Sequence, residues 1–166
     1  EEDCPSEKKR YGCICGAGLA SNAYHMTAPH VDGKGESEAM SRAITDAGIT
    51  ADRIDYISAH GSGTRQNDRV EAAAIHKVFG ASPPPVSSIK SMIGHSMGAA
   101  SVLELIASFL MLRRQTALPT LHCCTPDPIC ALDVIPEGPR RMPLRYILSN
   151  SFAFGGQTSS IVISGE

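Results

Sequence analysis

The protein has 166 residues, of which 42% are apolar and 19% are charged, and its formal net charge is −2. This length supports one folded domain with a buried core, and the composition excludes a disordered chain. The small net charge gives no reason to expect nucleic acid or an anionic membrane surface as a partner. No stretch approaches the ~20 apolar residues that span a bilayer, and the start does not resemble a secretory signal. A cytoplasmic location is therefore expected.

The first half of the chain alternates between strand and helix patterns. In chain order we expect a strand at 11–18, a helix at 35–47, a strand at 54–58 and a helix that ends at 79. The first strand is predicted because its residues are apolar or small. The first helix is predicted from an apolar stripe at helical spacing. Asn67 or Asp68 is expected to cap the second helix, because short polar side chains satisfy free backbone N–H groups there.

The second half ends in a predicted strand pair. We expect a strand at 86–88, a long helix at 94–112, an irregular proline-rich stretch at 119–143 with a brief strand near 132–135, and strands at 145–150 and 158–164. The long helix has no charge apart from Glu104, so it should be buried on most sides. The glycine pair at 155 and 156 suits a tight turn between the last two strands. This order of elements predicts an α/β fold.

Six cysteines are present, and in a cytosolic enzyme such residues are more often reduced core residues than disulfides. A zinc site formed by Cys13, Cys15, Cys123 and Cys124 is an alternative, although the CxxC pairs of structural zinc sites are absent. Cys123 and Cys124 lie in the proline-rich stretch, where at most a packing role is expected.

The first candidate chemical cluster is the run Ala-His-Gly-Ser-Gly-Thr at 59–64, where a strand is predicted to end. Catalytic groups gather at the carboxyl ends of strands in α/β sheets, and the glycines allow close approach of a substrate. Ser62 and Thr64 offer hydroxyl groups to a polar ligand. His60 alone is a weak signal, because a histidine at a strand end is as often structural as catalytic.

The second cluster, at 87–95, leads into the long predicted helix and contains Lys90 and His95. In the first turn of that helix, His95 would feel the positive end of the helix dipole, which favours a neutral imidazole. Lys90 lies among small and apolar residues, so a buried position is favoured over a surface position. Glu104 is its candidate partner, and the alternative for Glu104 is one exposed helix position.

The third cluster is Asn-Ser-Phe-Ala-Phe-Gly-Gly at 150–156. Phe152 is best interpreted as core. Phe154 lies between Ala153 and Gly155 and has room to move, and its backbone N–H is a candidate oxyanion donor.

Together with Tyr-His-Met-Thr at 24–27, these clusters resemble the β-ketoacyl synthases, the condensing enzymes of fatty-acid and polyketide assembly. The resemblance runs from about residue 11 to 163 and rests on the combination of motifs. The segments 60–68 and 88–92 are most similar to ketosynthase subunits of bacterial type II polyketide synthases, and 151–157 to fatty-acid enzymes and relatives that make reduced or polyene chains.

The resemblance implies the C-terminal half of a thiolase-like αβαβα fold, as a domain at 11–166 after a polar terminal segment at 1–10. It also implies decarboxylative Claisen condensation of malonyl-carrier protein with an acyl thioester. The implied roles are as follows: His60 and His95 hold the malonyl thioester oxygen, Lys90 is the catalytic lysine with Glu104 as its partner, Ser62 and Thr64 line the pantetheine channel, Phe154 is the gate, and His25 and Thr27 lie near the channel mouth. The substrates are carried on the phosphopantetheine of an acyl carrier protein, and the reaction needs no metal or redox cofactor.

The chain departs from the family pattern in one respect. None of its cysteines has the small-residue setting of the family's nucleophile, and the chain is about half the family's length. We therefore expect the cysteine on an N-terminal half or partner chain, within a dimeric ketosynthase or a ketosynthase/chain-length-factor assembly. A split subunit, a cleavage product and a part of a longer chain remain open.

Two other readings belong to different classes. One is a non-catalytic partner such as a chain-length-determining subunit, and retention of His60, Lys90 and His95 argues against it. The other is a different thiolase-fold enzyme. Degradative thiolases use a second cysteine in this half and initiating synthases use histidine with asparagine, so the pair Lys90 and His95 disfavours both.

Overall fold

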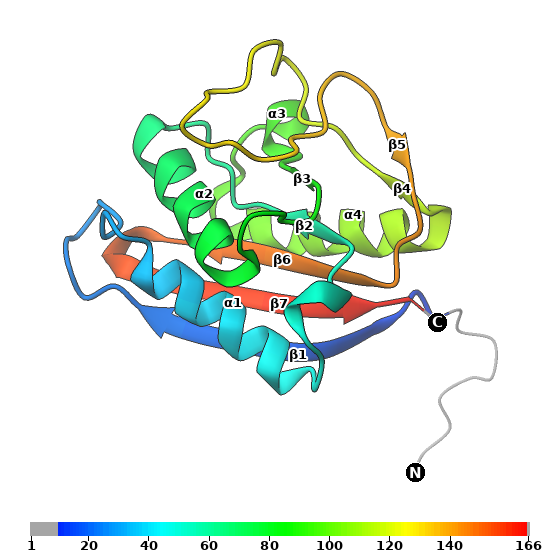
Figure 1. The fold of residues 1–166 in the computed structure, drawn as a ribbon, viewed down its shortest axis with the longest axis horizontal. Helices are drawn as coiled ribbons and strands as arrows, with labels where there is room; N and C mark the ends of the chain where they lie inside the picture. Colours follow the sequence, from blue (N-terminus) through cyan, green and yellow to red (C-terminus); the bar gives the residue numbers. More distant parts are fainter. Residues whose placement is uncertain (1–9, 166) are drawn as a thin grey trace.

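A computed structural model describes residues 10–165 and contains a mixed five-stranded sheet with helices on both faces (Figure 1). The sheet strands are β1 (Cys13–Ser21), β2 (Tyr56–Ser58), β3 (Val86–Ser87), β6 (Tyr146–Phe152) and β7 (Gln157–Ser164), and a separate two-stranded sheet holds β4 (Thr116–Ala117) and β5 (Arg140–Arg141). The helices are α1 (Lys34–Asp46), α2 (Arg65–Phe79), α3 (Lys90–Ile93) and α4 (Ala100–Arg114), with 3-10 turns η1 (Ala51–Arg53), η2 (Met97–Ala99) and η3 (Phe154–Gly156).

The strand order is β1-β7-β6-β2-β3, with β2 parallel to both β3 and β6. The last strands form the predicted pair: β6 and β7 are antiparallel and are joined through η3. Gly155 and Gly156 have φ values of 80° and 76° in this turn, a conformation that glycine adopts without steric cost. The pairing places η3 close to the end of β2, where the first cluster begins.

Both faces of the sheet are covered, because side chains alternate between them along each strand. Ile57, Leu148 and Val162 pack in the core under α1 and α2, whereas their neighbours Tyr56, Ile147 and Ile163 pack in the core on the α4 side. Figure 1 shows α1 and α2 in front of the sheet and α4 behind it.

The two sides are covered to different extents. On the α1 side a Cβ at Gly18 would lie 2.0 Å from the carbonyl oxygen of Ala39, so glycine permits a close approach of helix and strand. On the other side, α4 buries Met111 and Leu112 against the sheet. Its outer surface leaves four large apolar side chains between 40% and 56% exposed: Val102, Leu103, Ile106 and Leu110. No element within residues 10–165 covers that surface, so the predicted burial of this helix on most sides requires a cover from outside the described chain.

Three local predictions are wrong. The long helix begins at Ala100 rather than at 94, because Gly94 and Met97 have positive φ values and interrupt it. Residues 132–135 form no strand, only an isolated bridge between Val134 and Val86. Thr64, and neither Asn67 nor Asp68, caps α2 by accepting a hydrogen bond from the backbone N–H of residue 67 at 3.3 Å.

The polar terminal segment predicted at 1–10 lies, except for its last residue, outside the described residues. Within the described part of the chain, no helix has the length and apolar character needed to cross a membrane.

Candidate active site

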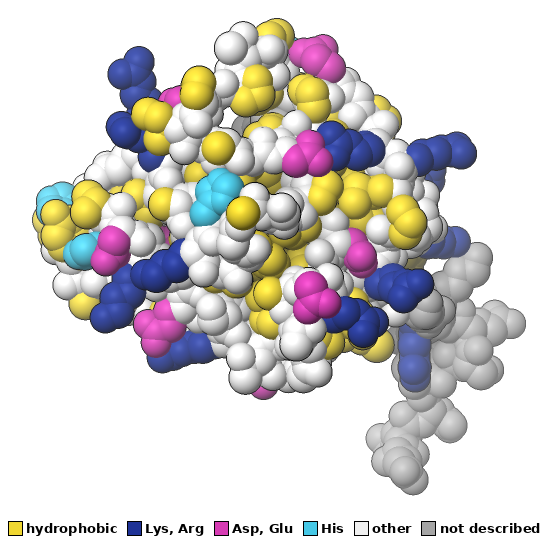
Figure 2. Space-filling model, in the orientation of Figure 1, with side chains coloured by type: hydrophobic (Ala, Val, Ile, Leu, Met, Phe, Trp, Pro, Cys, Tyr) yellow, Lys and Arg dark blue, Asp and Glu magenta, His cyan; other side chains and the backbone are white. Residues whose placement is uncertain are grey.

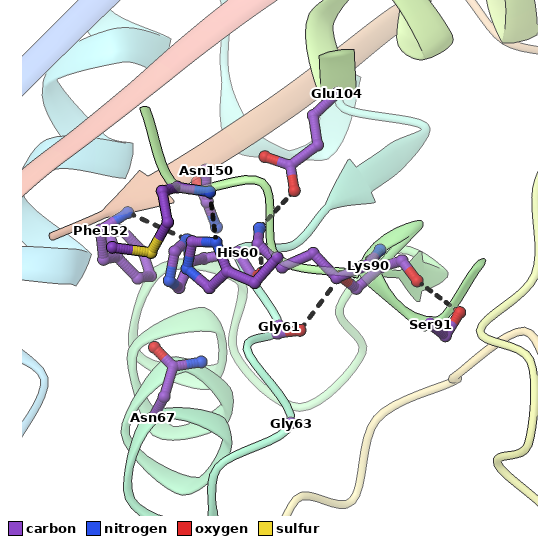
Figure 3. Close-up of polar contacts among 12 residues, drawn as sticks. His60, Gly61, Gly63, Asn67, Lys90, Ser91, Glu104, Asn150 and Phe152 are labelled. Atoms are coloured by element: carbon purple, nitrogen blue, oxygen red, sulfur yellow. Dashed lines mark hydrogen bonds and ion pairs between the residues drawn. The ribbon is translucent and has the colours of Figure 1, made fainter. Parts of the chain in front are cut away.

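His60 lies directly beyond β2 and is almost fully buried, with 6% of its surface exposed. The parallel pairing of β2 with β6 brings it beside Phe152, whose backbone N–H donates to Nδ1 of His60 at 3.3 Å. Their rings also approach, with 5.5 Å between centroids. Figure 3 shows His60, on the loop that follows β2, beside Phe152. Phe152, interpreted from sequence as core, therefore orients His60.

Glu71 on α2 fixes the backbone around His60. Its Oε1 accepts from the N–H of His60 and its Oε2 from the N–H of Gly61, each at 2.9 Å. The side-chain amide of Asn150 on β6 donates to Oε1 at 3.2 Å. Burial raises the pKa of Glu71, and these hydrogen bonds act against that shift. Glu71 is not among the residues predicted from the sequence, although its position on the buried face of α2 with Ala74 and Ile75 is a usable signal.

Lys90 and Glu104 form the buried ion pair predicted from the sequence. The ammonium group of Lys90 also donates to the carbonyl oxygen of His60 at 2.6 Å (Figure 3). Burial raises the pKa of the Glu104 carboxyl group, and the hydrogen bond from Lys90 lowers it. The second carboxylate oxygen of Glu104 has no hydrogen-bond partner among the described residues. This pair ties α3 and α4 to the loop that carries His60.

His95 lies in the irregular segment between α3 and η2 and is exposed. It is therefore not in the first turn of a long helix, and the prediction of that position is wrong. The backbone N–H of Met97 donates to Nδ1 of His95 at 3.1 Å.

The two imidazoles lie edge to face, with a ring-centroid distance of 5.4 Å and an interplanar angle of 79°. In each ring, Nδ1 accepts a backbone N–H, so a neutral ring carries its proton on Nε2. Burial, followed by the charges of Lys90 and His95, lowers the pKa of His60 to about 3. At neutral pH His60 is therefore an uncharged N–H donor with a fixed tautomer.

The hydroxyl groups of Ser62 and Thr64 lie together at the start of α2, 3.0 Å apart. Ser62 is partly buried and Thr64 is exposed. Because Thr64 also caps α2, its side chain is held in place on the surface near His60.

His25, Thr27 and Phe154 lie on two loops that contact each other. The N–H of Gly155 donates to the carbonyl oxygen of Met26 at 2.7 Å, and Nδ1 of His25 accepts from the N–H of Thr27 at 3.1 Å. Phe154 is 71% exposed. The structure therefore places these three residues at one edge of the site, beside the turn from β6 to β7.

The five described cysteines do not join this cluster of polar groups. Within residues 10–165, no three histidine, cysteine or acidic side chains are grouped so that they could hold a metal ion. Cys124 contacts Glu137, with its sulfur 3.7 Å from a carboxylate oxygen, and Cys130 lies near the start of α2.

Comparison with known families gives one match over most of the chain. Residues 11–124 match the model for the β-ketoacyl synthase C-terminal domain. The chain is 44% identical over 169 residues to 3-oxoacyl-[acyl-carrier-protein] synthase 2 of Coxiella burnetii, which covers 98% of this chain and 41% of the relative. It is 45% identical over 154 residues to a putative polyketide beta-ketoacyl synthase 1 of Streptomyces cyaneus, covering 92% and 36%. The chain thus spans about two fifths of the length of these relatives.

Solved structures agree with the sequence matches. The ishigamide ketosynthase/chain length factor superposes with a TM-score of 0.92 at 39% identity, over 95% of this chain and 39% of that chain. A type II polyketide synthase acyl carrier protein in complex with its ketosynthase gives 0.91 at 39% identity, over 94% and 39%. A β-ketoacyl synthase from Burkholderia phymatum gives 0.89 at 37% identity, over 94% and 38%. The predicted α/β, thiolase-like fold is confirmed.

Proposed function

Because the chain belongs to the β-ketoacyl synthase family, as a C-terminal domain of that family, we propose that it supplies the decarboxylation machinery of a β-ketoacyl-[acyl carrier protein] synthase. The observation that carries this proposal is the edge-to-face pair of imidazoles of His60 and His95. Each has its Nδ1 occupied by a backbone N–H, which leaves Nε2–H as the donor.

The chemistry needs donors of this kind. In malonyl-carrier protein, the bond to the free carboxylate breaks, carbon dioxide leaves, and the electron pair moves to the thioester oxygen as an enolate. Two N–H donors, one from each imidazole, stabilise that oxygen, and a preorganised donor contributes about 10²–10³ in rate. The enolate carbon then attacks an acyl–cysteine thioester, which forms a carbon–carbon bond and releases the cysteine thiolate.

Lys90 and Glu104 have a supporting role in this proposal. The ammonium of Lys90 contacts the backbone carbonyl oxygen of His60, and its charge helps to keep that imidazole neutral. We expect Ser62 and Thr64 to bind the pantetheine arm of the carrier protein, Phe154 to act as the gate, and His25 and Thr27 to line the channel mouth. The reaction itself calls for no metal or redox cofactor.

The nucleophilic cysteine is expected to come from outside this sequence, on an N-terminal half or a partner chain. The exposed apolar side of α4 supports this expectation, because such a surface is characteristic of an interaction site. His95 precedes the N-terminal end of that helix and is exposed as well. A ketosynthase half, or a ketosynthase paired with a chain length factor, is the proposed partner. A monodisperse, cooperatively melting monomer of this chain alone would contradict this arrangement.

A non-catalytic, chain-length-factor-like subunit is the second candidate, because two of the similar structures contain a chain length factor. A subunit without chemistry has no need for a buried lysine that contacts the backbone of an uncharged histidine. Mass spectrometry of the assembled enzyme after incubation with acyl-carrier protein separates the two candidates. We expect the acyl group on a cysteine of the partner and loss of turnover when this chain carries His60→Ala. Acylation of a cysteine in this chain, or unchanged turnover, would reject the proposal.

A further inference from the structure

A concave site, separate from the candidate active site, lies at the C-terminal end of α4, where β1 begins and β7 ends. Its volume is about 560 Å³. Four arginines line it, Arg10, Arg53, Arg113 and Arg145, together with the aromatic rings of Tyr11 and Tyr146. The sequence has ten arginines and a net charge of −2, so four of them around one pocket is a strong local concentration of positive charge. Figure 2 shows dark-blue side chains at this edge of the molecule and others at the opposite edge.

The four guanidinium groups come from separate segments: residue 10, the turn η1, the last turn of α4 and the residue before β6. Within residues 10–165, none of the four forms an ion pair with a carboxylate. An acidic side chain beside them, Asp55, accepts two backbone hydrogen bonds. Its Oδ2 accepts from the N–H groups of Arg145 and Tyr146 at 2.6 and 2.9 Å. The charge of the pocket is therefore not neutralised by the described part of the chain.

The other polar groups of the wall are satisfied by one another. The side chain of Gln115 donates to the carbonyl oxygens of Leu112 and Leu144, each at 2.7 Å, and accepts from the N–H of Leu144. The guanidinium of Arg113 lies 5.2 Å from the ring centroid of Tyr11, which holds it against a flat apolar surface. What the pocket offers to a ligand is thus a set of cationic N–H donors.

We propose that this pocket binds a small molecule that carries two or more phosphate groups. A guanidinium presents a planar fork of donors that matches phosphate oxygens in a bidentate geometry. Four arginines that line one pocket from different segments offer more donors than one phosphate can use, so a ligand with several anionic groups fits them better. The volume lies in the range of small-molecule sites, roughly 300–1,000 Å³, and a bound polyanion would offset the repulsion among the four charges. This site is independent of the proposed condensation.

Titration calorimetry of the assembled enzyme at physiological salt, with tripolyphosphate as the probe, tests this proposal. We expect saturable binding, tighter than that of inorganic phosphate, and a loss of about tenfold or more in affinity for each of Arg53→Gln and Arg145→Gln. Arg114→Gln is the matched control, because Arg114 is the exposed neighbour of Arg113 and does not line the pocket. Thermal midpoints without ligand establish that each variant is folded.

Three results would overturn the proposal. They are an absence of saturable binding, equal affinities for tripolyphosphate and inorganic phosphate, and a loss of affinity in Arg114→Gln as large as in the two pocket variants.

Discussion

The two histidines of the site occupy contrasting regions of the molecule. His60 is buried and held from several sides by groups of this chain: Glu71 fixes its backbone, Phe152 its ring and Lys90 its carbonyl oxygen. His95 is exposed, lies in an irregular segment, and has a single hydrogen bond within the described residues, from the backbone of Met97. One donor of the proposed pair is therefore preorganised by the domain itself.

This difference indicates which histidine is positioned by the domain itself and which depends on groups outside it. The region of His60 is completed by α2, β6 and α3, which all belong to the described chain. The region of His95 adjoins the exposed apolar side of α4, so its final shape depends on whatever covers that surface. The following predictions test whether the two regions differ in this way.

The largest expected effect is on the ion pair that supports the buried region. Lys90→Ala leaves the Glu104 carboxylate buried and unpaired, which should lower the free energy of unfolding by about 3–5 kcal/mol and abolish turnover. The double variant Lys90→Ala/Glu104→Ala should regain part of that stability and none of the activity. Denaturant unfolding of the assembled enzyme measures both variants. Equal stability of the single and double variants would show that the pair is not energetically coupled.

The two histidines should respond differently to substitution. His60→Ala and His95→Ala should each lower malonyl decarboxylation by about 10²–10³ and leave acyl loading on the partner's cysteine largely intact. Only His60→Ala should also reduce stability, by about 1–3 kcal/mol, because it removes a buried side chain and leaves the partly buried N–H of Phe152 without an acceptor. Paired measurements of rate and urea midpoint test this. If His95→Ala destabilises the protein as much as His60→Ala, the contrast between the two regions is wrong.

The buried imidazole of His60 should make the stability of the protein depend on pH. The pKa of His60 is lowered to about 3 in the folded protein, against roughly 6.5 in an unfolded chain. The unfolded state then binds more protons between these values, so His60 contributes stability that is present above pH 6.5 and is lost as the pH falls toward 3. Glu71 and Glu104, whose pKa values are raised, act in the opposite direction.

Comparison of variants isolates the contribution of His60 from those carboxyl groups. His60→Asn should make the loss of stability between pH 7 and about pH 4 less steep than in the unchanged protein. His122→Asn, at an exposed histidine outside the site, is the control. Identical slopes for His60→Asn and the unchanged protein would contradict a neutral, buried imidazole.

The smallest effect on stability is expected at the rim of the site. Phe154 is largely exposed, so Phe154→Ala should change the unfolding free energy by no more than about 0.5 kcal/mol. If it is the gate, its loss should permit malonyl decarboxylation before acyl loading, which appears as carbon dioxide release uncoupled from condensation. Tight coupling in this variant would remove the gating role.

Much of the fold follows from local patterns. The apolar stripe of α1 and the two apolar runs around Gly155 and Gly156 predicted a helix and a strand pair that the structure contains. The start of α4 was mispredicted because Met97 adopts a positive φ, which no residue pattern announces for a side chain other than glycine. Residues 132–135 failed as a strand because they pair with β3 at one bridge alone.

The site, too, could be predicted only where a local sequence pattern marks the residue. The motifs located His60, Lys90 and His95, and the ion pair with Glu104 follows from an isolated charge on an apolar helix. Glu71 was missed because a helical glutamate usually faces water. Its role depends on contacts with residues 10, 11 and 79 positions away, which sequence spacing does not reveal. The catalytic roles themselves stay predictions.

One measurement tests the central claim, that this chain provides the donors for decarboxylation, most directly. Malonyl-carrier protein labelled in its free carboxylate is incubated with the assembled enzyme, and release of labelled carbon dioxide is followed for the unchanged chain and for His60→Ala/His95→Ala. The account predicts that release falls to background in the double variant while the partner's cysteine still becomes acylated. Release at the unchanged rate would contradict it.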